Sequence, residues 1–212
     1  MTRAHFVEEL EAIHQSMLSM GELTLRSIGS ALKCLTNTGG ATFEEVTALE
    51  SEIDEANTII HDRALKILIL QSPVAGDARL ITSILESIID LEQIADYAYE
   101  ISDLALQTDR RPASQVLSQV VAIGEQVREM LASALDGWSH LDRAAGLSLR
   151  SSETSIRTGA RALADRLYQL TSSPADAQLY VNLILICKHF ERMARLSAFV
   201  AEQAALAAPV ER

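Results

Sequence analysis

The chain has 212 residues, of which 48% are hydrophobic, 4% aromatic and 22% charged, and its formal net charge is −11. The length suits one large domain or two small ones, and the apolar fraction is too high for a disordered chain. The scarcity of Gly (9) and Pro (4) disfavours a turn-rich β-sandwich or barrel. The acidic charge argues against nucleic acid as a partner of the whole surface.

No segment of the sequence has the length and apolar character of a membrane span. The longest purely aliphatic runs, residues 67–70 and 183–186, fall far short of the roughly 18 residues that a span needs. The first residues, MTRAHFVEELEA, lack the apolar stretch of a secretory signal, and the two cysteines, Cys34 and Cys187, are therefore expected to be reduced. We expect a cytoplasmic protein that reaches a membrane only through its partners.

Long stretches with helical periodicity alternate with short breaks. Apolar residues recur at three- and four-residue steps over six stretches, at about residues 3–35, 42–70, 74–106, 113–139, 142–171 and 175–207. Turn-forming residues separate them at 37–40, 72–73, 111–112 and 172–174, with a weaker break near 140–142. Long helices with short connections predict an all-α protein of six antiparallel helices.

The two halves of the chain look like copies of one three-helix unit. An offset of 103 residues aligns Glu50 with Glu153, and an offset of 99 aligns Glu92 with Glu191. The offset changes because the second copy is shorter between its last two helices. We predict two tandem three-helix bundles related by internal duplication, with units at residues 1–108 and 109–212.

The excess of acid lies entirely in the first half. Residues 1–106 contain 6 Lys/Arg and 18 Asp/Glu, a net charge of −12, whereas residues 107–212 contain 12 Lys/Arg and 11 Asp/Glu, a net charge of +1. Drift of a solvated surface is one explanation of this asymmetry. The other is a cation held by the first half.

Two ExxxD motifs concentrate carboxylates on successive helices of the first half. Glu50 and Asp54 form the first motif, and Glu92 and Asp96 form the second. The i, i+4 spacing places both carboxylates of a pair on one helical face, where like charges repel unless a cation or protons intervene. We predict these four residues as metal ligands. An oxygen-rich donor set suits iron(III), manganese or magnesium, and it is also compatible with zinc.

The second half has arginine at both positions that correspond to the aspartates. Its equivalent motifs pair Glu153 with Arg157 and Glu191 with Arg195. Opposite charges at i, i+4 stabilise a helix, and here they also place cations where a metal would sit. We therefore predict that the second half holds no metal cluster at this face.

Other polar residues extend the motifs or have simpler explanations. Asn57 and His61 lie on the helical face of the first motif, while Glu100 and Asp103 lie on that of the second, so that His61, Glu100 and Asp103 are candidate outer ligands on geometry alone. His14 follows Glu11 at the ExxH spacing of ferritin-like di-iron sites, but such sites need two of these motifs. We expect His14 on a solvated face.

Three parts of the sequence resemble the PhoU family of phosphate-uptake regulators, and the resemblance extends over nearly the whole chain. The segment at 71–79, QSPVAGDAR, is similar to the family's QxPxAxDLR, with Ala78 in place of Leu. The segment at 90–96, DLEQIAD, is similar to its ERIGD, with Gln93 for Arg and Ala95 for Gly. The first helix contributes Phe6, Leu10, Met17, Met20 and Gly21. The resemblance implies a three-helix bundle in each half.

The resemblance also implies a metal site and a function. The family's paired E/DxxxD motifs bind multinuclear iron or zinc clusters, which carries over to the first half and not to Arg157 and Arg195. The implied function is non-enzymatic regulation: damping import by the phosphate-specific ABC transporter and keeping the associated sensor histidine kinase off when phosphate is plentiful. The implied partners are the transporter ATPase and that kinase, and we expect a homodimer.

Two other classes of protein stay open at this point. One is a carboxylate-bridged di-metal oxidase or hydrolase, and the other is a metal-free helical scaffold whose acidic face binds a basic partner. An enzyme would add a general base and a concave pocket, and the acidic stripe offers neither in sequence. We therefore expect no enzymatic activity, while the sequence leaves the metal, the partner surface and the oligomeric state open.

Overall fold

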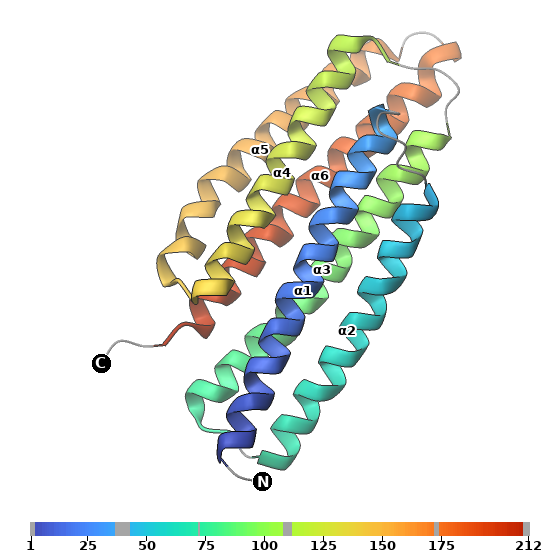
Figure 1. Cartoon of the computed structure of the whole chain (residues 1–212). Coiled ribbons are helices and arrows are strands. Elements are labelled where there is room, and N and C mark those ends of the chain that lie inside the picture. Colours follow the sequence, from blue (N-terminus) through green and yellow to red (C-terminus); the bar gives the residue numbers. More distant parts are fainter. Residues whose placement is uncertain (1–2, 37–42, 72, 108–111, 172–173, 210–212) are drawn as a thin grey trace.

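A computed structural model of the chain describes residues 3–36, 43–71, 73–107, 112–171 and 174–209. Six α-helices make up nearly all of this described part (Figure 1): Arg3–Thr36 (α1), Phe43–Gln71 (α2), Ala75–Leu106 (α3), Ser114–His140 (α4), Arg143–Leu170 (α5) and Pro174–Ala207 (α6). The described residues contain no strand. None of the helices within these ranges is both long enough and apolar enough to span a bilayer.

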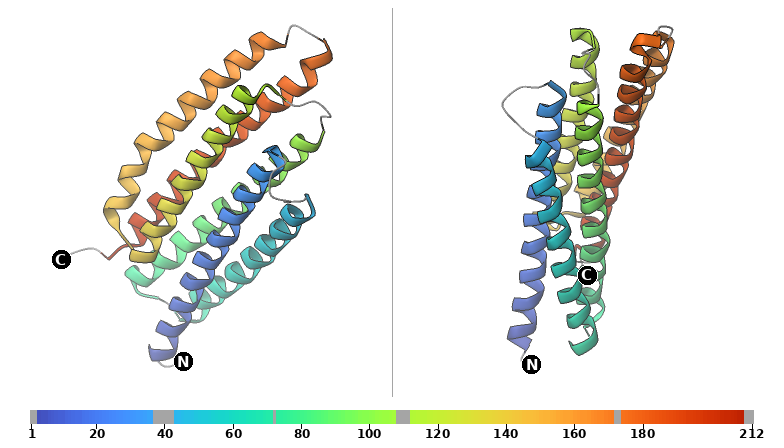
Figure 2. Two further views of the ribbon diagram at one scale, coloured as in Figure 1. Left: turned by 45° about the horizontal axis from the view of Figure 1, so that its top comes forward. Right: turned by 90° about the vertical axis from the view of Figure 1, so that its right-hand side faces the viewer.

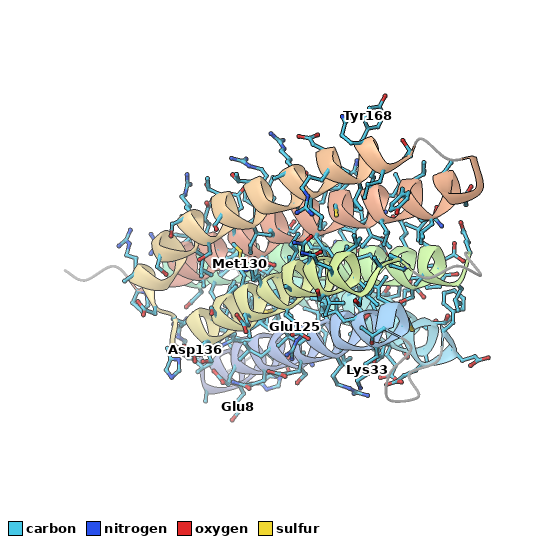
Figure 3. All side chains as sticks on the ribbon, turned by 90° about the horizontal axis from the view of Figure 1, so that it is seen from above. Glu8, Lys33, Glu125, Met130, Asp136 and Tyr168 are labelled. Carbon is cyan, nitrogen blue, oxygen red and sulfur yellow. The ribbon has the colours of Figure 1, made fainter. Side chains whose placement is uncertain are left out.

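The helices form two groups of three that lie along a common long axis (Figure 2). Helices α1, α2 and α3 pack on one another, as do α4, α5 and α6. The groups meet where α1 contacts α4 and α3 contacts α6, so that α2 and α5 lie at opposite outer edges (Figure 1). Figure 3 shows Tyr168 projecting from the outer edge of α5. The predicted all-α fold of two tandem three-helix bundles is confirmed.

One hydrophobic core runs through both groups and receives side chains from all six helices. The apolar series predicted for the first helix is buried within it: Phe6, Leu10, Ile13, Met17 and Met20. Burying a large aliphatic or aromatic side chain stabilises the fold by about 1.5–3 kcal/mol, so this shared core dominates the stability. The proposed unit boundary at 108/109 lies outside the described residues, and the division into 1–108 and 109–212 stays a prediction.

The weak break predicted near 140–142 is a tight junction between α4 and α5. Leu141 has a left-handed backbone with φ 48°, and the Asp142 N–H donates to the Gly137 carbonyl at 2.9 Å, as in a Schellman cap. The Asp142 carboxylate then accepts from the Ala144 N–H at 2.8 Å and caps α5. The break predicted at 37–40 lies outside the described residues, as do parts of the other three.

Two glycines allow α1 and α4 to pack closely. A Cβ added at Gly21 would lie 2.4 Å from a methyl carbon of Leu135, and one added at Gly124 would lie 2.4 Å from a methyl carbon of Leu32. The 103-residue offset relates Gly21 to Gly124 and Leu32 to Leu135, so that the two contacts are reciprocal. Such reciprocity is expected where two copies of a unit face each other across an approximate two-fold axis.

The expectation that His14 is solvated is wrong. His14 is only 6% exposed, its Nε2 lies 3.1 Å from the Trp138 carbonyl oxygen, and its ring packs against the Trp138 ring with centroids 5.6 Å apart. A buried polar side chain is tolerated when it is hydrogen-bonded, and here the partner comes from the other repeat. Trp138 is itself fully buried and donates from Nε1 to the Val200 carbonyl at 2.9 Å.

Candidate metal site

The two acidic motifs of the first repeat meet where α2 packs against α3. Glu50 and Asp54 come from α2 and Asp96 comes from α3, and one carboxylate oxygen of each lies within 4.8 Å of the others. Each motif has its two residues one turn apart, so the pairing of the two helices is what closes the group. The structure thus brings three of the four predicted ligands together, while the bound metal stays a prediction.

The fourth predicted ligand, Glu92, lies beside this triad and is held by a hydrogen bond. The Asn57 side-chain amide of α2 donates to the Glu92 carboxylate of α3 at 2.8 Å. Burial raises the pKa of Glu92, and the Asp54 and Asp96 carboxylates raise it further, so Glu92 belongs to the same electrostatic cluster. Asn57 therefore orients the fourth carboxylate, a role that its place on the motif's helical face did not reveal.

The cluster concentrates negative charge that no cation of the described residues pairs with. Burial raises the pKa of Glu50, and the neighbouring Asp54 and Asp96 carboxylates raise it further. Burial also raises the pKa of Asp96, with added contributions from Asp54 and Glu100. No Lys, Arg or His in the described ranges forms an ion pair with Glu50, Asp54, Glu92 or Asp96. A bound cation would relieve this repulsion.

The chemistry of the donors fits a hard cation. All four side chains offer carboxylate oxygens, which iron(III), manganese and magnesium accept, and the side chains of Asp54 and Asp96 are exposed, so water can complete a coordination shell. Glu50 and Glu92 are half-buried, which holds part of the donor set in place. When bound, a cation would supply positive charge that joins α2 to α3.

The candidate outer ligands mostly have other contacts. His61 lies 3.9 Å from Asp62, and Asp103 accepts a hydrogen bond of 2.7 Å from a glutamine one turn later in the chain. Glu100 lies 3.2 Å from His189 of α6, although its charge still raises the pKa of Asp96. These contacts place none of the three in the triad.

The equivalent face of the second repeat carries cations, as expected, but in a different pairing. Arg157 contacts Glu153 at 3.4 Å, which is the predicted i, i+4 pair. The predicted pair of Glu191 with Arg195 does not form: Glu191 contacts Arg161 at 3.2 Å and Lys188 at 2.7 Å.

The Arg195 guanidinium instead lies over the Phe199 ring, 5.9 Å from its centroid. Glu191 is only 10% exposed at its side chain, and cations from two other positions already satisfy it. Helical spacing alone could not rank these competing partners, because one of them belongs to the neighbouring helix.

Similarity to known proteins covers most of the chain. Residues 17–105 match the family model described as PhoU domain. A phosphate-specific transport system accessory protein PhoU homolog from Synechocystis sp. is 29% identical over 205 residues, covering 95% of this chain and 90% of that protein. A homolog with the same name from Pseudomonas aeruginosa is 28% identical over 199 residues, covering 93% of this chain and 82% of that protein.

Two solved structures have the same fold as this chain. The crystal structure of PhoU from Pseudomonas aeruginosa matches with a TM-score of 0.88 at 27% identity, covering 94% of this chain and 96% of that one. The phosphate transport system regulatory protein PhoU from Streptococcus pneumoniae shares the fold, with a TM-score of 0.86 at 24% identity over 95% of this chain. The likeness defines a class of tandem three-helix-bundle proteins. Within that class, the comparisons support the assignment to the PhoU family that the sequence motifs indicated.

Proposed function

We propose that this protein is a non-enzymatic regulator of phosphate transport. The supporting observation is the near full-length likeness to relatives named phosphate-specific transport system accessory proteins, together with a TM-score of 0.88 to a PhoU structure. An accessory protein acts through contacts with other proteins, and two packed helical bundles offer long, preformed surfaces for such contacts. The comparisons favour this role over a di-metal oxidase or hydrolase.

We further propose which proteins this chain contacts and in which direction it changes their activity. The protein acts from the cytoplasm as a homodimer, damps the phosphate ABC transporter through its ATPase, and helps keep the associated sensor histidine kinase off. Affinity-tagged protein from phosphate-replete cells should co-purify with the ATPase or the kinase after cross-linking. Recovery of neither, under conditions where both are expressed, would contradict these partners, and a monomeric mass in light scattering would contradict the homodimer.

We also propose that Glu50, Asp54, Glu92 and Asp96 hold a metal ion or cluster in the first repeat. Family resemblance points to iron or zinc, and the donor chemistry also admits manganese or magnesium. The convergence of three carboxylates within 4.8 Å supports a cation here, as do the raised pKa values of two of them, Glu50 and Asp96.

Elemental analysis of purified protein tests this site. Asp54→Ala and Asp96→Ala should each lose most of the bound metal, because each removes one of three converging ligands. Glu52→Ala is the matched control, since it removes an exposed acid of the same helix outside the cluster. Unchanged metal in both aspartate variants would remove the site. A metal-loaded protein that turns over dioxygen or a hydrolysable ester would instead support the enzyme alternative.

A further inference from the structure

A cavity of about 420 Å³ lies between α5 and α6 in the second repeat, and α3 contributes to its wall through Gln93 and Tyr97. It occupies the face that corresponds to the acidic cluster of the first repeat. Six charged residues line it: Arg157, Arg161, Arg192, Arg195, Glu153 and Glu191. Four cations against two anions give the lining a net positive charge.

The two glutamates are already neutralised by other residues of this face. Glu153 contacts Arg157 at 3.4 Å, and Glu191 contacts both Arg161 at 3.2 Å and Lys188 at 2.7 Å. Neither glutamate therefore forms an ion pair with Arg192 or Arg195.

Arg192 and Arg195 form no ion pair with any residue in the described ranges. Arg192 donates to the Tyr97 hydroxyl at 3.5 Å and lies 5.7 Å from the centroid of the Tyr97 ring. Arg195 lies over the Phe199 ring. Its charge lowers the pKa of Asp90 of α3 somewhat, although the two side chains form no ion pair. Contacts with aromatic rings orient a guanidinium group without neutralising it. Two oriented cations are thus left facing one cavity.

Comparison of the repeats shows that the basic lining is a feature of the second repeat and not of the equivalent face of the first. With the two offsets, Arg157 and Arg161 correspond to Asp54 and Thr58, and Arg192 and Arg195 correspond to Gln93 and Asp96, listed in the same order. A single change would be enough to lose a carboxylate site. Here all four cavity arginines stand at positions that are neutral or acidic in the first repeat, which is the pattern expected of a site for an anion.

We propose that this cavity binds a phosphate group, either of inorganic phosphate or of a phosphorylated metabolite such as a nucleotide. The planar guanidinium group pairs with two phosphate oxygens at once, and charge-assisted hydrogen bonds of this kind are the strong ones. Arg192 and Arg195 supply the unneutralised charge, and the Tyr97 hydroxyl and the Gln93 amide can donate further hydrogen bonds. The volume falls within the usual range for small-molecule sites.

Isothermal titration calorimetry on the full-length protein tests the proposal. The protein is first stripped of metal with a chelator, so that phosphate cannot bind through a cation in the first repeat. Sodium phosphate and magnesium-free ATP are titrated separately at low salt. Binding of phosphate identifies the free anion as the ligand, and binding of ATP alone identifies a phosphorylated metabolite. Binding of neither would overturn the proposal.

Variants locate the binding. Arg192→Ala and Arg195→Ala should each weaken it by about ten-fold or more, because each removes a charged hydrogen-bonding partner. Arg166→Ala, which removes an exposed arginine of α5 outside the cavity, should leave it unchanged. Undiminished binding in both cavity variants, or equal weakening by Arg166→Ala, would refute the cavity as the site.

Two further readouts separate binding from folding and from the regulatory role. Helix content and the melting temperature identify any variant that fails to fold. Arg195→Lys keeps the charge but loses the two-pronged geometry, so its affinity should fall between those of the wild type and Arg195→Ala. A lysine variant weaker than the alanine variant would contradict the charge argument. The titration needs no transporter or kinase, so its failure would leave the proposed function standing on its own test.

Discussion

The two repeats share one frame and differ in the charge of their equivalent faces. In the first repeat, Glu50, Asp54 and Asp96 converge without an ion pair to any cation of the described ranges. In the second, arginines surround a cavity at the corresponding place. Most of the apolar positions that build the bundle are buried in both copies, whereas exposed positions change at little cost in stability, usually within about 0.5 kcal/mol. A duplicated fold can therefore keep its core and carry two different sites.

The largest effect is expected from residues that correspond in the two repeats but differ in burial. Trp138→Ala should destabilise the protein by about 3–5 kcal/mol, because Trp138 is fully buried and donates a hydrogen bond to the Val200 carbonyl of α6. Leu35→Ala, at the corresponding position, should cost about 1–2 kcal/mol, since Leu35 is only partly buried. Urea unfolding measures both, and equal losses would contradict the assigned asymmetry.

Exchanging the charges between repeats tests the comparison directly. The double variant Arg157→Asp and Arg195→Asp recreates the acidic pattern in the second repeat, so it should lose phosphate binding and gain metal. The reverse double variant, Asp54→Arg and Asp96→Arg, should lower metal affinity by roughly 100-fold or more. Elemental analysis and titration with manganese measure both. A second repeat that gains no metal after the exchange would show that these positions alone do not define the site.

Asp90 and His189 are related by the 99-residue offset and should oppose each other in pH dependence. Burial, with the Glu86 charge, raises the pKa of Asp90 to about 6, while Arg195 offsets part of the rise. The folded state then holds the proton more tightly than the unfolded one, so stability falls as pH rises from about 4 through 6. Asp90→Asn should remove this fall and stabilise the protein at pH 7 by about 1 kcal/mol, after allowance for solvent screening.

His189 should behave in the opposite sense. Burial lowers its pKa, and the Arg192 charge adds to this, whereas Glu100 partly offsets it. The folded state then binds the proton more weakly, so stability is lost as pH falls from the unfolded value of 6.5 through the lower pKa of the folded state. His189→Gln should reduce that acid loss. Thermal melts of the metal-free protein between pH 5 and 8 separate the two variants, and shifts of the same sign in both would contradict the assignment.

The smallest change in stability is expected at Glu50 and Glu153, which occupy corresponding positions in the two repeats. Glu153→Gln removes one partner of an ion pair with Arg157 and should destabilise the protein by about 0.3–0.5 kcal/mol. Glu50→Gln removes a repelling charge instead and should stabilise the metal-free protein slightly. Chemical unfolding with and without chelator measures whether each variant gains or loses stability. Destabilisation by Glu50→Gln in metal-free protein would show that the carboxylates do not repel one another appreciably.

Helix boundaries and the core could be predicted from sequence because they depend on local periodicity. The third predicted helix, at about 74–106, is observed as Ala75–Leu106, and the apolar series from Phe6 to Met20 is buried as expected. The meeting of the ExxxD motifs followed from antiparallel packing of neighbouring helices. These features need no knowledge of contacts between distant parts of the chain.

Contacts that depend on competition between partners could not be predicted. His14 was expected in water because nothing in the local sequence reveals its hydrogen-bonding partner, the Trp138 carbonyl, which lies 124 residues away. Arg195 was expected to pair with Glu191, which instead contacts a cation on α5 and another on its own helix. The spacing of Arg192 and Arg195 was visible, but the cavity they share with α3 depends on how the repeats pack.

Because the core is continuous, ligand binding at the acidic face of the first repeat and at the basic face of the second should affect the same unfolding transition. Because side chains from all six helices pack into one cluster, neither half has a separate interior that could melt alone, and unfolding should be a single cooperative event. A ligand that binds the native state at either face then raises the melting temperature of the entire chain. One calorimetric trace would therefore register occupancy of both faces, and the sum of their contributions would show whether they act independently.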